Sequence, residues 1–303
     1  MIYKKSVLLA LLGIFSFLYS TGQGCSDAGF CTINTFKPNS EDSIPSLKNH
    51  LKTGINYGAA DHNISVLGAY IEYKRQLNNF LTTDLKLTSA SHKGNNITTF
   101  NLSDIFFNLN YIPVEKLRFT IGLKVPLSDG NDKKNDLPLP MDYQSSLGTF
   151  DLIAGIGYKI NRLDLVAAIQ QPLTQNKNEF FADIYAHDDL FSSFQSTNNY
   201  KRSSDVLIRI SYPFSFGDNF KIIAGLLPIY HLNNDKYTDL TGTEREIKGS
   251  HGLTLNGNIY FNYFINRNNS LQLSFGAPLI VRDQRPDGLT RSYVVNLEYI
   301  FGF

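Results

Sequence analysis

The chain has 303 residues, a formal net charge of +1 and two cysteines, and its 22 Phe and 17 Tyr contrast with two Met and no Trp. A charge this close to zero excludes a global electrostatic attraction to nucleic acid or to an acidic surface, so no nucleic-acid partner is expected. The abundance of strand-forming aromatic residues is more typical of an exported β-structured chain than of a large soluble enzyme.

Residues 1–22 have the composition of a secretory signal peptide. Two lysines precede the apolar run 7–19, and small residues follow as far as Gly22. The run is shorter than the roughly 20 residues that a membrane-spanning helix needs. No later uncharged stretch approaches that length. We therefore predict cleavage after Gly22 and a mature chain without a transmembrane helix.

Segment 23–47 contains both cysteines, Cys25 and Cys31, and two prolines, Pro38 and Pro45. In an oxidising compartment the cysteines are expected to close a small disulfide loop. A lipoprotein cut before Cys25 is the alternative, although the residues ahead of it lack the apolar side chain usual three positions upstream. The segment is too irregular for a strand, and we expect a periplasmic strap or a plug inside a barrel.

From residue 48 onward, twelve segments alternate apolar and polar side chains and are separated by turn-forming residues. Their approximate spans are 49–59, 63–76, 80–90, 97–112, 115–127, 148–160, 163–173, 200–213, 219–231, 251–265, 270–282 and 291–303.

The connections between these segments fall into two classes. Every second connection is short, whereas the others are mostly longer and polar, notably 128–147, 174–199, 232–250 and 283–290. Long connections therefore emerge on one side, as in outer-membrane barrels with short periplasmic turns and long extracellular loops. Soluble β-sandwiches also contain alternating strands, but they have no reason to sort their loops in this way. The sequence predicts an all-β transmembrane antiparallel barrel of about 12 strands over 48–303, placed in the lipid of the bacterial outer membrane.

The last segment ends on alternating aromatic side chains at Tyr299, Phe301 and Phe303. Strands that end this way are typical of outer-membrane barrels, and we predict that these three residues are the assembly signal read by the barrel-assembly machinery. The strand is expected to close the barrel against the first strand near 52–57.

The opposite faces of the same strands carry charged and amide side chains. Because a charge at the lipid-facing midplane costs about 2–4 kcal/mol, these side chains are expected to face the lumen. The candidate lumen-lining residues are Lys52, Tyr70, Asp104, Arg118, Lys124, Asp205, Arg209, Asn256, Asn258, Tyr260, Arg282 and Glu298. They could line a hydrated passage, or opposite charges could pair across strands and plug a narrow barrel. Inward aromatic residues favour a narrow, substrate-restricted passage over a wide pore.

A pre-barrel segment with two cysteines, strands rich in Tyr, Phe and Asn, and a terminal Phe303 together resemble outer-membrane barrels of Bacteroidota-type bacteria. More loosely, the chain is similar to the hydrophobic-compound transporters of the fatty-acid and phenol-degradation-associated group. That group usually has fourteen strands and an Asn-Pro-Ala signature, whereas this chain offers about twelve strands and Lys37-Pro38-Asn39. The resemblance implies a porin-like transporter.

Three functions are compatible with this pattern. The first is a passive channel or transporter for small molecules, and the second is a non-transport barrel whose extracellular loops bind a partner or surface. A third, an outer-membrane hydrolase, is suggested only by acidic residues in the loop containing His187-Asp188-Asp189. None of the six histidines has Ser or Thr two positions away, and no metal-ligand or phosphate-loop spacing occurs. We therefore expect no catalytic residue, no metal and no cofactor.

Overall fold

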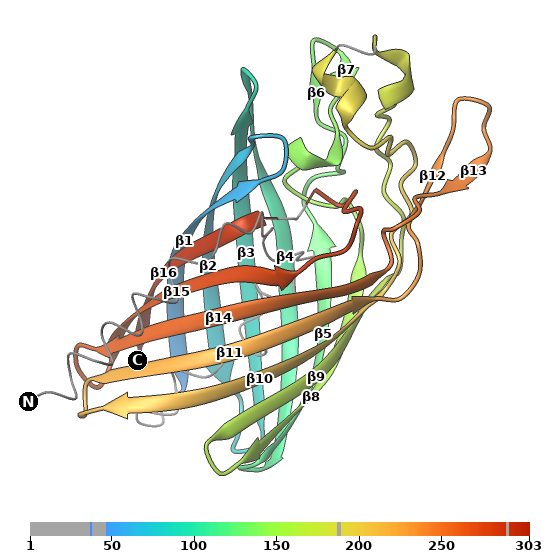
Figure 1. The fold of residues 1–303 in the computed structure, drawn as a ribbon. Coiled ribbons are helices and arrows are strands. Elements are labelled where there is room, and N and C mark those ends of the chain that lie inside the picture. Colours follow the sequence, from blue (N-terminus) through green and yellow to red (C-terminus); the bar gives the residue numbers. More distant parts are fainter. Residues whose placement is uncertain (1–36, 38–46, 187–188, 289–290) are drawn as a thin grey trace, which may run out of the picture.

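The computed structural model describes residue 37 and residues 47–186, 189–288 and 291–303. These residues form a closed barrel of twelve antiparallel strands (Figure 1), so the predicted fold class and strand number are confirmed. The barrel strands are β1 (Asn49–Ala60), β2 (Ser65–Gln76), β3 (Leu81–Gly94), β4 (Ile97–Val114), β5 (Leu117–Pro126), β8 (Asp151–Ile160), β9 (Leu163–Pro172), β10 (Asp205–Phe216), β11 (Phe220–His231), β14 (Gly252–Phe264), β15 (Asn269–Ile280) and β16 (Arg291–Gly302). A search of the described residues for helices found none with the length and apolar character to span a membrane.

The barrel closes between the first and last strands. Lys52 pairs with Ile300 and Tyr57 with Val295, so the predicted contact of the last strand with residues 52–57 is confirmed. Every other strand pairs with its neighbours in the sequence of barrel strands. The whole barrel therefore follows from consecutive hairpins and one long-range closure.

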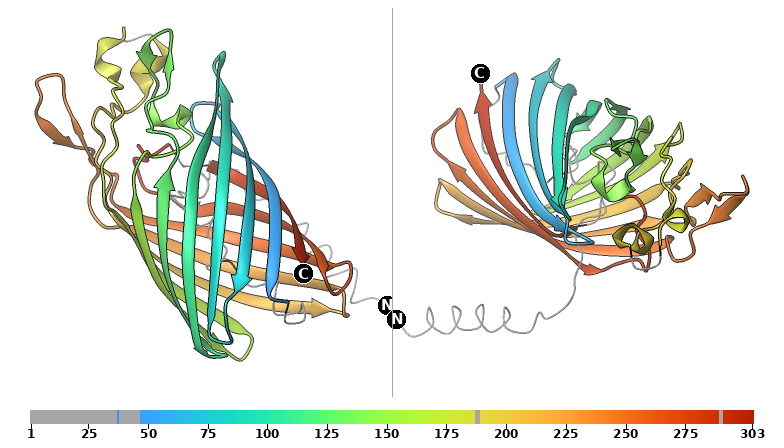
Figure 2. Two further views of the ribbon diagram at one scale, coloured as in Figure 1. Left: turned by 180° about the vertical axis from the view of Figure 1, so that it is seen from behind. Right: turned by 90° about the horizontal axis from the view of Figure 1, so that it is seen from above.

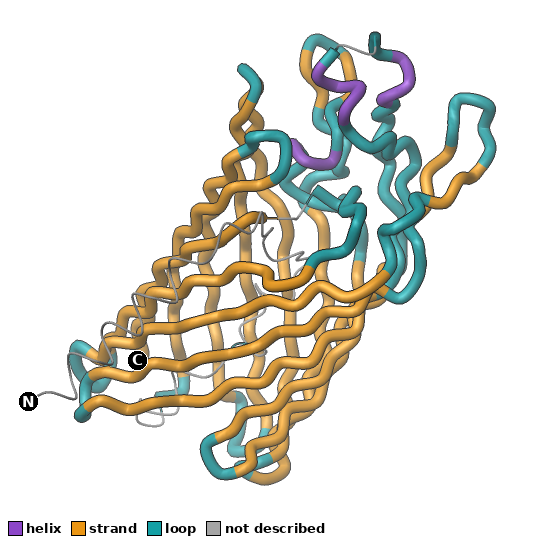
Figure 3. Tube along the Cα trace, in the orientation of Figure 1, coloured by secondary structure: helices purple, strands orange, loops and turns teal. Residues whose placement is uncertain are grey.

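The long loops gather at one end of the barrel, which we call the outer mouth (Figures 1 and 3). They contain two small hairpins, β6 (Lys133–Lys134) with β7 (Leu137–Pro138) and β12 (Lys236–Thr238) with β13 (Glu244–Glu246). They also contain the short 3-10 helices η4 (Met141–Tyr143), η5 (Ala182–Ile184) and η6 (Leu190–Ser193). The C-terminus lies at the other end (Figure 2). The predicted sorting of loops is thus present, and the loops themselves contain structure that was not predicted.

The two faces of each strand differ in the way that a lipid-exposed barrel requires. On β5, Phe119, Ile121 and Leu123 are exposed, and Ile121 reaches 53%. Thr120 and Lys124, which alternate with them, are buried, with Lys124 at 1%. A strand turns successive side chains to opposite faces, so the apolar set points outward and the polar set inward.

Several strand ends differ from the sequence-based spans, and two of these differences affect the candidate site. The eighth barrel segment begins at Asp205, so residues 200–204 belong to the preceding loop. The eleventh ends at Ile280, which places Arg282 in the loop beyond β15. The register of β14 with β15 shifts between Leu255 and Asn256, close to where the ladder ends. Arg282 therefore acts at the outer mouth and not on the inner wall of a strand.

Candidate functional site

The inner wall near the closure of the barrel carries a group of paired charges. Glu298, which is 0% exposed, accepts hydrogen bonds from Lys37 and from Asn296 Nδ2, the latter at 2.7 Å. Lys52 Nζ lies 3.8 Å from Glu298 Oε2 and 3.9 Å from Glu72 Oε1. Carboxylates and ammonium groups from β1, β2 and β16 therefore neutralise one another inside the barrel, with Lys37 contributed from before the first strand.

Tyr70 lies in the same region. The Nζ atom of Lys86 is 3.9 Å from the ring centroid, and that of Lys37 is 5.7 Å away. A Cβ at Gly54 would come within 2.3 Å of Tyr70 Cζ, so the ring occupies the space that only glycine leaves open on β1. Tyr70 is 9% exposed, and its ring lies on the inner face of the barrel.

A second group of polar contacts joins β5, β8 and the loop between them. Lys124 Nζ lies 2.8 Å from Asp151 Oδ2 and donates to Thr149 Oγ1 at 3.2 Å. Asp104 on β4 accepts a hydrogen bond of 2.7 Å from Ser146 Oγ. The loop 127–150 is thus attached to the inner wall of the barrel through side chains of strands predicted to face inward.

One part of the wall is apolar. A cluster of buried side chains from β4, β8, β9, β10 and β11 lines it, and we call it the apolar wall. Its members are Phe106, Ile153, Val166, Ala168, Leu207, Leu227 and Ile229. Arg209 on β10 projects among these strands and donates from Nη1 to Tyr260 Oη at 2.9 Å. The lumen therefore contains both hydrocarbon and charges, and the two adjoin, because Phe106 is the register partner of both Lys86 and Lys124.

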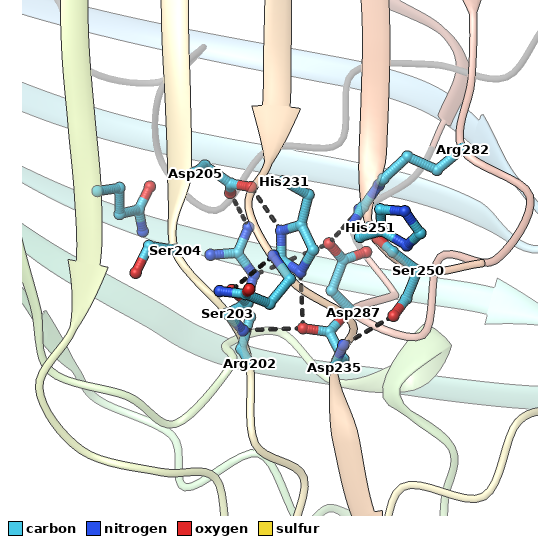
Figure 4. Close-up of polar contacts among 12 residues, drawn as sticks. Arg202, Ser203, Ser204, Asp205, His231, Asp235, Ser250, His251, Arg282 and Asp287 are labelled. Carbon is cyan, nitrogen blue, oxygen red and sulfur yellow. Dashed lines mark hydrogen bonds and ion pairs between the residues drawn. The ribbon is translucent and has the colours of Figure 1, made fainter. Parts of the chain in front are cut away.

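At the outer mouth, Arg202, Asp205, His231, Asp235, Arg282 and Asp287 form one buried cluster, which we call the mouth cluster (Figure 4). His231 contacts Asp205 Oδ1 through Nδ1 at 2.6 Å and Asp235 Oδ1 through Nε2 at 2.7 Å. Both ring nitrogens can donate only when the imidazole is protonated. Three carboxylates then face two guanidinium groups and one imidazolium, and the cluster is neutral.

The arginines of the mouth cluster tie three loops together. Arg202 binds Asp205 and lies 3.9 Å from Asp287, and Arg282 lies 3.0 Å from Asp287 and donates to the Ser250 carbonyl at 2.7 Å. Burial would raise the pKa of Asp287, but Arg282 and Arg202 outweigh it and hold that pKa below its usual value. The cluster therefore fixes the ends of β10, β11 and β15 relative to one another.

The loops above this cluster pack into a cap with its own apolar core, formed by side chains from several loops and strand ends, among them Ile64, Tyr143, Phe180 and Phe194. Asn178 is buried at its centre and donates to the carbonyls of Gly130 and Leu139, each at 3.0 Å. Its Oδ1 accepts from Phe180 N and Thr197 Oγ1. One side chain thus joins the loops 127–150 and 173–204.

Most of the predicted lumen residues lie on the buried face of their strands. Arg118 is partly exposed and lies beside Gly157 on β8, Asn258 lies beside Gly276 on β15, and Asn256 is 0% exposed. Asp205 and Arg282 belong to the mouth cluster. The structure shows these positions, whereas a role in selectivity stays a prediction.

Sequence reasoning missed His231, at the end of β11, and four charged residues outside the barrel strands: Lys37, Arg202, Asp235 and Asp287. Arg202 precedes Asp205 by three residues and Asp235 follows His231 by four, a spacing that could have suggested pairing at the strand ends. Their position in polar loops made them indistinguishable from solvent-exposed side chains.

The predicted signal peptide and the predicted Cys25–Cys31 disulfide lie outside the described residues, because Lys37 is the one residue described before residue 47. The loop residues His187 and Asp188 also lie outside the described residues. Within the described part of the chain, no group of three or more His, Cys, Asp or Glu side chains is arranged to hold a metal ion.

No protein-family profile matches the sequence, and no curated protein matches it. Solved barrels have a similar architecture. The CymD monoaromatic hydrocarbon channel is 10% identical with a TM-score of 0.47, covering 94% of this chain and 98% of that one. The NanC porin is 8% identical with a TM-score of 0.45, covering 84% and 98%. LpxR from Salmonella typhimurium is 9% identical with a TM-score of 0.48, covering 84% and 100%. At these identities the likeness is one of general barrel shape.

Proposed function

We propose that the protein is a channel of the bacterial outer membrane through which small molecules pass selectively. The observation that supports this most strongly is the set of ionisable side chains on the inner wall, including Lys52, Glu72, Lys124 and Glu298. Charges inside a membrane protein are costly and commonly mark solute or ion pathways. A barrel with a purely structural role could fill its interior with neutral or apolar side chains instead.

The passage is proposed to be narrow. Tyr70, Phe106, Tyr260 and Phe264 are all buried on the inner face. At the outer mouth, Arg285 of the last long loop lies 2.8 Å from Asp61 in the β1–β2 turn, so contacts between loops extend to the first hairpin of the barrel. Selective diffusion would follow from lumen charges and aromatic rings that contact each solute, with the cap loops moving to admit it.

Proteoliposomes loaded with a size series of neutral and charged solutes test this proposal. We expect uptake of small solutes and exclusion of oligosaccharides in vesicles that contain the folded protein. A variant lacking 23–47 should be measured beside it, since it removes Lys37 and its contact with Glu298. Absence of flux for every solute in both proteins would reject the channel.

A second candidate is a non-transport barrel whose cap binds a partner or surface. Ile184, Leu190 and Leu240 are exposed apolar side chains in the long loops, which favours this alternative. It predicts no flux, together with loss of whole-cell binding to the target surface when the hairpin 236–246 is replaced by a short turn.

We propose no hydrolase activity. His231 is a possible general base, but its two ring nitrogens are both occupied by carboxylates. Ser250, close to it in Figure 4, donates its hydroxyl to the Ile247 carbonyl at 2.6 Å. A nucleophile needs a hydrogen bond to a free ring nitrogen, and this arrangement uses both for structure. An esterase assay with purified protein is expected to show no turnover above the rate of a His231→Gln variant.

A further inference from the structure

Arg209 is a buried cation that has no carboxylate within 4.0 Å among the described residues. Lys52, Lys124, Arg202 and Arg282 each lie within 4.0 Å of a carboxylate. Arg209 is 2% exposed, and its one hydrogen bond within the described structure goes to a neutral hydroxyl, that of Tyr260. Its Nε and Nη2 atoms have no hydrogen-bond partner in the part of the chain that the structure describes.

The positions of Nε and Nη2, the two free donors of Arg209, indicate the kind of ligand that they could bind. Nε and Nη2 lie on the same edge of the guanidinium plane, and their hydrogens point in parallel along that edge. This is the edge that binds a carboxylate with two parallel hydrogen bonds. Tyr260 Oη accepts a hydrogen bond from Nη1, which lies outside this edge. That bond fixes the guanidinium plane, so the edge with the two free donors is held in one orientation.

A buried arginine cannot avoid the desolvation penalty by losing its proton, because the guanidinium remains charged at every physiological pH. A buried cation without a partner is strongly unfavourable. The arrangement is therefore explained most simply by an anion that completes the site when it binds.

The surroundings define the rest of the ligand. Val166 is the register partner of Arg209 on β9. Leu227 faces it from β11, between the registered pairs Leu207–Ile229 and Ile210–Leu226. These residues belong to the apolar wall, so the space beside the guanidinium is lined by hydrocarbon. A small anion without an apolar part would leave that surface unused.

The amide of Asn256 is a second buried polar group without a partner among the described residues, and it lies at the same level of the inner wall as Arg209. Asn256 on β14 is the register partner of Leu227, so it is two strands away from Arg209, roughly 10 Å between backbones. Asn256 is 0% exposed, and neither its Oδ1 nor its Nδ2 atom has a hydrogen-bond partner among the described residues. Buried amides are normally satisfied, so this side chain is a second available contact for a polar group of a ligand.

We propose that Arg209 is the carboxylate-binding residue of a solute site in the lumen, with the apolar wall holding the body of a small organic acid and Asn256 contacting a further polar atom. This inference rests on the proposed channel function and names the solute class that the site takes. Arg209 is four residues further along β10 than Asp205, roughly 13 Å below the mouth cluster, so a solute would meet it after passing the cap.

Isothermal titration calorimetry on the detergent-solubilised mature protein tests the site without requiring transport. Benzoate is the anionic probe and benzyl alcohol its neutral counterpart of similar shape. We expect benzoate to bind, and Arg209→Met to weaken its binding at least about tenfold, the effect of losing a charged hydrogen bond. Binding of benzyl alcohol should change little. Arg209→Lys retains the charge but not the two parallel donors and should fall between the two.

Arg162→Met, an exposed change in the β8–β9 turn, serves as the control and should bind as the wild type does. Heat-modifiable mobility on gels verifies that every variant is folded. Arg209→Met should also unfold at a higher denaturant concentration than the wild type without ligand, because it removes an unpaired buried charge.

Equal benzoate affinity in the wild type and Arg209→Met, or no benzoate binding to the folded wild type, would overturn the site. Solute flux in proteoliposomes is measured separately. Flux without benzoate binding would retain the channel and reject the site, whereas Arg209-dependent binding without flux would support the site and reject the channel.

Discussion

Replacement of Glu298 with glutamine should reveal whether the lumen is dry in the folded barrel. Glu298 is 0% exposed and receives a hydrogen bond from Lys37, while Lys52 lies 3.8 Å away. The substitution keeps the size of the side chain but leaves two ammonium groups facing a neutral amide. Removing one partner from a buried ion pair costs about 3–5 kcal/mol, whereas an exposed pair contributes about 0–1 kcal/mol. We therefore expect Glu298→Gln to lower the free energy of unfolding by about 3–5 kcal/mol.

The assay is reversible urea unfolding of the barrel in lipid vesicles, followed by tyrosine fluorescence and gel mobility. Glu246→Gln is the matched control, because the same chemical change is made at an exposed position in β13. A double-mutant cycle with Lys37→Met isolates the Lys37 contact and should give a coupling of about 1.5–3 kcal/mol. A loss below about 1 kcal/mol for Glu298→Gln would refute the reasoning and indicate a water-filled lumen around these charges.

Three further predictions concern the cap and the last strand. The Asp142 carboxylate, 3.5 Å from His62 Nδ1, raises the pKa of His62, so this contact stabilises the cap below about pH 6.5 and is lost as pH rises through the folded-state pKa. Protease nicking of the cap should increase over that range in the wild type, and a pH profile of nicking unchanged in His62→Gln would contradict this assignment. Asn178→Ala removes four hydrogen bonds and should speed amide hydrogen exchange in both 127–150 and 173–204, while equal exchange would argue against its role as the joint. Phe303→Ala should lower the heat-modifiable fraction recovered in outer membranes several-fold relative to Phe100→Ala, the same change at another exposed phenylalanine, and equal recovery would count against the assembly signal.

The barrel was predictable because its strands pair with their neighbours in the sequence and alternate lipid-facing and lumen-facing side chains with a period of two. Alternation on β5 places Ile121 and Lys124 on opposite faces of the strand. Because a charge in lipid is costly, the face with Lys124 must be the one that points into the lumen. Strand number and the sorting of loops follow from counting turns. The closure between Lys52 and Ile300 follows from the even number of strands, because both termini return to the same end.

The site was less predictable because its contacts join distant residues. Arg202 and Asp287 meet although the chain between them forms four barrel strands, and nothing in either loop indicates the partner. Alternation predicts that Arg209 faces inward, but no pattern along β10 shows that this buried guanidinium has no carboxylate partner among the described residues. The extra length predicted for the strand ending at Arg282 arose because polar loops next to a strand can continue its alternation by chance.

Planar-bilayer recording of the purified full-length mature protein tests the central claim, selective passage through this barrel, most directly. We predict small, infrequent conductance steps in the wild type, and a higher open probability in Asn178→Ala, whose cap is loosened. Absence of any conductance from folded, membrane-inserted protein in both forms would contradict the account.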